Sequence, residues 1–100
     1  VGIMTSERVR EWLADLHGHL ESTAELPVAT DASRWLGEAE AVVADVATGD
    51  PPASVVAKRV EQARELLSHV DGTGDAEADD HVAAARDLAE RTLRAVEADD

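Results

Sequence analysis

Four histidines and an excess of carboxylates are the residues of this sequence that have the means to do chemistry. His17 and His19 are two positions apart, and a helix places such side chains about 200° from each other around its axis. Each therefore needs an acidic partner on its own helix face, four residues away. In three pairs the acid stands four residues before the histidine: Asp15–His19, Glu65–His69 and Glu77–His81. Each pair offers two ligands, whereas zinc sites take three or four, so we predict surface ion pairs and neither a metal nor another cofactor.

Four carboxylates in the second half of the chain resemble part of a known catalytic motif. The segment EQARE contains Glu61 and Glu65, and EADD contains Glu77 and Asp80. They are similar to the acidic helix (Glu-Glu-x-x-Glu) and later Glu-x-x-Asp with which all-helical nucleotide pyrophosphohydrolases hold Mg²⁺ on a triphosphate. Glu77 and Asp80 match the second element, but Glu61 and Glu65 are four residues apart instead of three, and the doubled Glu is missing. This resemblance implies a magnesium-dependent enzyme as the alternative function.

The sequence lacks the residues and motifs that several other kinds of chemistry require. The chain has no cysteine, no Gly-rich phosphate loop and no Gly-x-Ser-x-Gly motif. Its arginines are scattered and outnumbered, so no basic stripe predicts binding to nucleic acid, and no apolar run has the length of a membrane span. These features favour a protein that is not an enzyme and that acts by binding other proteins.

The elements that position these residues are predicted to be four helices, because apolar residues recur every 3.6 positions throughout. The first begins at a cap on Thr5 or Ser6 and ends before Pro27; the second begins at Thr30 or Asp31 and ends at Gly49. The third has Asp50 as its cap and Pro51 as its first residue, and it ends at Gly72. Asp75 caps the fourth. Thr-Gly-Asp, at 48–50 and 73–75, is thus interpreted as a helix stop followed by a helix start.

Short connections predict one all-α domain over residues 1–100, an antiparallel up-down four-helix bundle, with residues 1–4 disordered. The alternative is a three-helix bundle whose first helix lies in a dimer interface. Trp12 and Trp35 are the only aromatic residues among many alanines and valines, and each is expected to fill a core layer. The other interpretation makes Trp12, with Leu16, an anchor for a partner protein.

The composition points to a salty environment. Twenty-two acidic residues face nine basic ones, of which Lys58 is the one lysine, and the net charge is −13. Such a chain resembles small all-helical proteins of unknown function from halophilic archaea, which implies a cytoplasm at molar salt. A core of small side chains buries little area, so we expect two copies to pack together as a homodimer.

Overall fold

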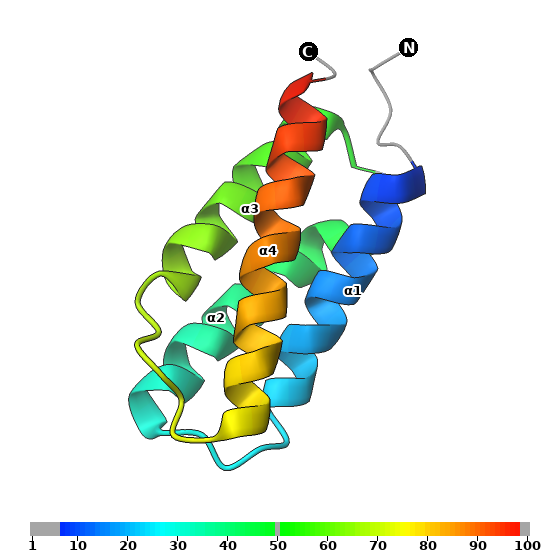
Figure 1. The fold of residues 1–100 in the computed structure, drawn as a ribbon. Coiled ribbons are helices and arrows are strands. Elements are labelled where there is room, and N and C mark those ends of the chain that lie inside the picture. The colour runs from blue at the N-terminus through cyan, green and yellow to red at the C-terminus, as the bar shows by residue number, and fades with distance from the viewer. Residues whose placement is uncertain (1–6, 50, 99–100) are drawn as a thin grey trace.

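The described part of the chain consists of four α-helices joined by short connections. The computed structural model describes residues 7–49 and 51–98, and these contain no β-strand. The helices are α1 (Glu7–Thr23), α2 (Thr30–Ala47), α3 (Ala53–Leu67) and α4 (Ala76–Ala98). Each runs antiparallel to the one before it, so α1 begins and α4 ends at the same end of the molecule (Figure 1). The prediction of an all-α, antiparallel up-down four-helix bundle is confirmed.

The four helices close into a ring around one core. Helices α1 and α3 each pack against both α2 and α4, and among the described residues neither diagonal pair of helices has Cα atoms within 8 Å of each other. The bundle measures 43 × 20 × 18 Å along its principal axes. Because α1 packs on two helices of its own chain, the three-helix alternative, with α1 in a dimer interface, is wrong.

The core is made of leucine, valine and alanine at the predicted helical spacing. Helix α1 contributes three fully buried leucines, whereas the other helices contribute mainly valines and alanines. Burying a leucine or valine side chain stabilises a fold by about 1.5–3 kcal/mol, and alanine contributes much less. Alanines such as Ala39, Ala63 and Ala85, which have no exposed surface, instead allow neighbouring helices to approach closely.

The predicted helix starts are confirmed at α4 and wrong at α2. Asp75 accepts a hydrogen bond at Oδ2 from the N–H of Ala78 (2.9 Å), as a capping residue does. Thr30, in contrast, lies inside α2, and the residue before it, Ala29, makes no side-chain cap. The N–H of Ala29 donates to the carbonyl of Thr73 (2.8 Å), so the two connections are joined directly before α2 begins. The expected caps Thr5, Ser6 and Asp50, and residues 1–4, lie outside the described residues.

Helix α3 is shorter than the sequence suggested at both ends. It begins at Ala53 after Pro52, so Pro51 is not its first residue. It ends at Leu67 and not near Gly72, and a turn then carries the chain towards α4. The glycines of the two Thr-Gly-Asp segments, Gly49 and Gly74, both have positive φ values (77° and 85°), but only Gly49 follows closely on a helix.

Candidate functional site

The carboxylates that resemble a magnesium site do not form one. Glu61 lies on α3 and accepts a hydrogen bond from Arg64 (2.6 Å), and Glu65 lies 3.8 Å from His69. Glu77 and Asp80 lie in the first turns of α4. No group of three acidic or histidine residues within 7–49 and 51–98 is arranged to hold a metal ion. Nothing in the geometry therefore supports the hydrolase alternative.

The connection before α4 is held by a buried threonine that the sequence did not mark out. Thr73 has no exposed surface, and its N–H and its hydroxyl both donate to Oδ1 of Asp79 (2.8 Å each). The backbone N–H and then the hydroxyl of Thr73 lower the pKa of Asp79 from its ordinary value. These hydrogen bonds, together with the cap at Asp75, fix the connection to the start of α4. The role of Thr73 and Asp79 is therefore structural.

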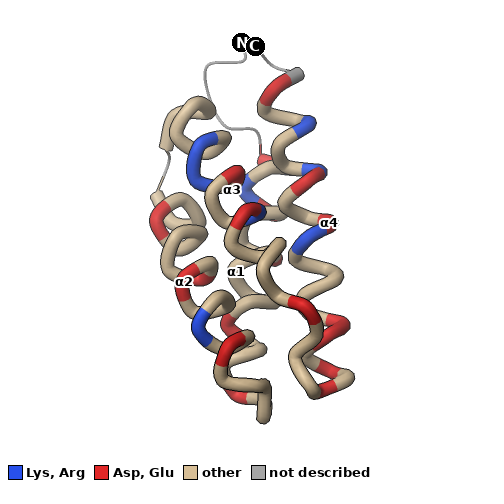
Figure 2. Tube along the Cα trace, turned by 90° about the vertical axis from the view of Figure 1, so that its left-hand side faces the viewer, with Lys and Arg blue, Asp and Glu red and all other residues tan. Residues whose placement is uncertain are grey.

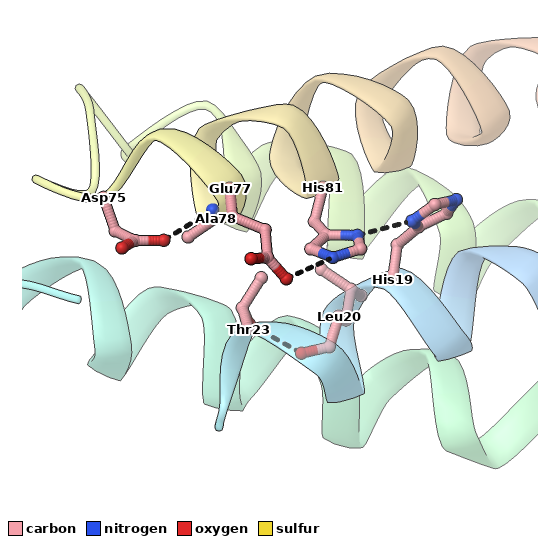
Figure 3. A network of polar contacts seen from close by, with 7 residues as sticks. All are labelled: His19, Leu20, Thr23, Asp75, Glu77, Ala78 and His81. Atoms are coloured by element: carbon pink, nitrogen blue, oxygen red, sulfur yellow. Dashed lines mark hydrogen bonds and ion pairs between the residues drawn. The ribbon is translucent and has the colours of Figure 1, made fainter. Parts of the chain in front are cut away.

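Two histidines meet across the bundle although the sequence separates them by most of its length. Nδ1 of His19 on α1 lies 2.8 Å from Nδ1 of His81 on α4, and Glu77 lies 3.9 Å from the other ring nitrogen of His81 (Figure 3). The spacing predicted the Glu77–His81 pair, and likewise Glu65–His69. For His19, however, the structure shows an imidazole as the partner. His17 hydrogen-bonds to Glu40 on α2 (3.0 Å).

Trp35 and His69 form one wall of an open hollow at the end of the bundle. Their rings are stacked, with centroids 4.3 Å apart and planes inclined by 18°. The hollow has a volume of about 480 Å³ and is lined by the first turns of α2 and by residues 69–72, with Asp31, Arg34 and Asp71 as its charged groups. Trp35 is half-buried, so it fills a core layer with one edge and lines a surface with the other.

The two interface candidates on α1 differ in exposure. Leu16 has no exposed surface and lies in the core of its own chain. Trp12 is half-buried, packs on the core and has the guanidinium of Arg8 6.0 Å from its ring centroid. A partner protein that approached α1 would therefore meet Trp12 and not Leu16.

A partly apolar outer surface lies where α2 packs against α3. We call it the α2–α3 face, and it is defined by Trp35, Val42, Val55, Arg59 and Leu66. Val55, with 41% exposure, is the only large apolar side chain classed as exposed among the described residues. The other four side chains are half-buried. On α3, positions 55, 59 and 66 follow the spacing of one helix flank. Arg64 lies on the opposite flank. Its pKa is raised by the hydrogen bond to Glu61 and, in addition, by the carboxylates of Glu90 and Glu97 on α4, so the flank with Val55 faces α2.

The α2–α3 face joins two helices of unlike charge. Helix α3 has three basic residues against two acidic ones, and it is the one helix of the four with a positive balance. Helix α2 has one arginine against four acidic residues. Figure 2 shows the basic positions in the first half of α3 beside the mainly acidic α2.

Comparison with known families finds a match for most of the chain. Residues 12–99 match a family described as a domain of unknown function, DUF8152. The chain belongs to the DUF8152 family. No curated protein and no solved structure matches it. The DUF8152 match begins at Trp12 and includes α2, α3 and the whole length of α4, so both the histidine contact and the α2–α3 face lie inside it.

Sequence reasoning on this DUF8152 chain missed Arg86, which closes the end of α3. Nη2 of Arg86 on α4 donates to the carbonyl oxygens of Leu67 (2.7 Å) and Val70 (2.6 Å). The Leu67 carbonyl is among those that a helix end leaves without an intrahelical partner, and the Val70 carbonyl lies in the turn that follows α3. The one available signal was an arginine next to the apolar stripe of α4, and spacing along a single helix does not say which other helix it reaches.

Proposed function

We propose that this DUF8152 chain is a non-catalytic helical interaction module that works in a salt-rich cytoplasm and binds a second copy of itself through the α2–α3 face. The observation that carries the proposal is the position of Val55. The one exposed large apolar side chain of the described residues stands on the one helix with a positive charge balance. Apolar contact and charge contact are thereby offered by the same surface.

The apolar part of the proposed contact is a row on two helices. Val55 and Leu66 on α3 and Val42 and Trp35 on α2 keep part of their surface in water in the single chain. Removing such surface from water is favourable by about 25 cal/mol per Å², and concentrated salt strengthens the effect. Tryptophan is also enriched among the residues that dominate interface energies.

The charge part favours a copy of the same chain as the occupant. In a dimer whose two-fold axis runs parallel to the helices, α2 of each copy lies against α3 of the other, and the same contact occurs twice. Acidic α2 then meets basic α3 in both contacts, so the face is complementary to itself. The same arrangement keeps like-charged helices apart, which adds specificity.

The stacked rings give the register of this contact. Trp35 and His69 lie at the same level of the bundle. Ten residues along each antiparallel segment, about 15 Å at 1.5 Å per residue, lead to Asp45 on α2 and Arg59 on α3. A two-fold axis parallel to the helices preserves this level, so we expect Arg59 of one copy against Asp45 of the partner subunit.

The high-salt part of the proposal is supported by the charge of the whole chain. A net charge of −13 over 100 residues opposes compaction by self-repulsion. Salt at 1 M shortens the screening length to about 3 Å. None of the described helices has the combination of length and apolarity that a bilayer span requires.

Sedimentation equilibrium at the lowest KCl concentration that keeps the chain folded tests the dimer. The wild type is expected to dimerise, and Asp45→Lys and Arg59→Glu are each expected to weaken the dimer by tenfold or more, because like charges then meet twice. Mixing the two variants is expected to restore dimers, since in the heterodimer Lys at 45 faces Glu at 59 and the other contact is native. Only a contact between copies predicts this recovery.

Arg91→Glu is the matched control. Arg91 is an exposed arginine on α4 that lies 3.0 Å from Asp87, and it is not part of the α2–α3 face. Its reversal changes the net charge as much as Arg59→Glu does and is expected to leave the dimer intact. A wild type that stays monomeric at all concentrations, or a mixture that forms no heterodimer, contradicts the proposal.

A further inference from the structure

Two imidazoles meet head to head between α1 and α4. The Nδ1 atoms of His19 and His81 are 2.8 Å apart, and the rings have centroids 5.1 Å apart and planes inclined by 47° (Figure 3). Both histidines are half-buried, and 24% of the His81 side chain is exposed. A direct contact of this kind requires one Nδ1 to donate a hydrogen and the other to present its lone pair.

The same two nitrogens are spaced almost as ligands of one metal ion are. Imidazole is the commonest metal ligand in proteins, and zinc–nitrogen bonds are about 2.0–2.1 Å long. Two such bonds place the nitrogens about 2.9 Å apart at a right angle and about 3.3 Å apart at the tetrahedral angle. The observed contact therefore needs to open by about half an ångström at most, with a tilt of each ring that brings the two lone pairs to a common point.

Glu77 is placed to prepare His81 for this role. Its Oε2 lies 3.9 Å from Nε2 of His81, the ring nitrogen that does not face His19. This distance is longer than a hydrogen bond, but the negative charge of the carboxylate still favours the proton on Nε2 and so leaves the near nitrogen free to bind. The donor of the pair binds an ion by carrying its single proton on Nε2 in place of Nδ1, so two neutral imidazoles release no net proton.

We propose that His19 and His81 bind one divalent transition-metal ion and thereby link α1 to α4. No third protein ligand completes the site among the described residues, so water fills the other positions and the ion exchanges readily. The negative charge of the chain raises the local concentration of cations. Two imidazoles favour copper over nickel and zinc, in the general order of affinity for nitrogen ligands. This proposal is independent of the dimer, because it uses neither α2 nor α3.

Titration of the full chain with CuCl₂ tests the site, at a pH where imidazole is ordinarily neutral and in the KCl concentration that keeps the chain folded. The wild type is expected to bind one Cu²⁺ per chain, with electron paramagnetic resonance showing two nitrogen ligands. His19→Gln and His81→Gln are each expected to lower the affinity at least tenfold. ZnCl₂ is expected to bind at the same residues, more weakly, and to raise the urea midpoint of the wild type but not that of His19→Gln or His81→Gln.

His17→Gln is the control, because His17 also contacts another helix but meets a carboxylate, Glu40, and no second imidazole. It is expected to bind copper as the wild type does. Circular dichroism shows whether each variant folds. If a variant does not fold, the number of nitrogen ligands on copper in the wild type still tests whether two histidines bind the ion. Copper held by oxygen ligands alone, or an affinity unchanged in His19→Gln and His81→Gln, overturns the proposal.

Discussion

Thr73 and Asp79 show how a single buried hydroxyl and one carboxylate hold a connection in place. Both donors of Thr73 point to the same carboxylate oxygen, and the N–H of Asp75 donates in turn to the Thr73 hydroxyl (3.1 Å). A carboxylate that accepts two hydrogen bonds is favoured in its charged form. Asp79 thus stabilises the folded chain only while it is ionised.

Asp79→Asn is expected to remove one acid-sensitive part of the stability. Because the pKa of Asp79 in the folded chain lies below its ordinary value of 3.8, its contribution is present above that value and is lost as the pH falls through the lower, folded pKa. Urea unfolding between about pH 5 and pH 2 measures it. The wild type should lose stability more steeply than the variant in this range, and Thr73→Val should lie between them because it keeps the N–H donor. Equal slopes in wild type and Asp79→Asn would show that the interaction contributes nothing.

At the scale of the element, α3 is defined by its neighbours as much as by its own sequence. Its apolar stripe predicts a helix, and Val56, Val60, Ala63 and Leu67 are all buried as that stripe requires. The end of α3, in contrast, does not follow from its sequence. Helical spacing continues to Val70, but the carbonyl groups of Leu67 and Val70 accept hydrogen bonds from Arg86 on α4, and α3 ends at Leu67.

Arg86→Ala is therefore expected to destabilise the bundle by about 1.5–3 kcal/mol, the usual contribution of a hydrogen bond made by a charged group. Arg86→Lys should recover part of this loss, because it keeps a positively charged donor. The recovery should be incomplete, because an ammonium group lacks the planar fork of the guanidinium. Chemical denaturation gives the free energies. Arg94→Ala, on the exposed side of the same helix and 4.0 Å from Glu90, is the comparison and should change stability by less than about 0.5 kcal/mol. Equal effects of the Arg86→Ala and Arg94→Ala changes would rule out a special role for Arg86.

At the scale of the whole molecule, charge and core composition act in the same direction. Twenty-two carboxylates repel one another around a core in which alanine and valine predominate outside α1. Salt weakens the repulsion by screening, and excluded salts strengthen apolar burial. The ion pairs that the structure shows on the surface, such as Arg91–Asp87, contribute little, because exposed pairs are typically worth 0–1 kcal/mol at about room temperature.

The free energy of unfolding is therefore expected to rise with salt. Raising KCl from about 0.1 M to about 1 M, where the screening length falls from about 10 Å to about 3 Å, should move the urea midpoint upwards. A variant with the exposed acids Glu38, Asp87 and Glu90 changed to their amides is the comparison, and it should need less salt for the same midpoint. A midpoint that does not depend on KCl would remove the support for a high-salt protein.

The sequence by itself determined the number of helices, their order, their antiparallel course and nearly all of the core. Period-3.6 apolar stripes and short connections are local properties, and an amphipathic helix such as α1 buries the same stripe whichever neighbour covers it. Only the tertiary structure decided which residues from separate helices meet. The contact of His19 with His81, the stacking of Trp35 on His69 and the reach of Arg86 to the end of α3 depend on the level and rotation of one helix against the next. Those quantities are set by packing between side chains far apart in the chain, and helical spacing within one element carries no information about them.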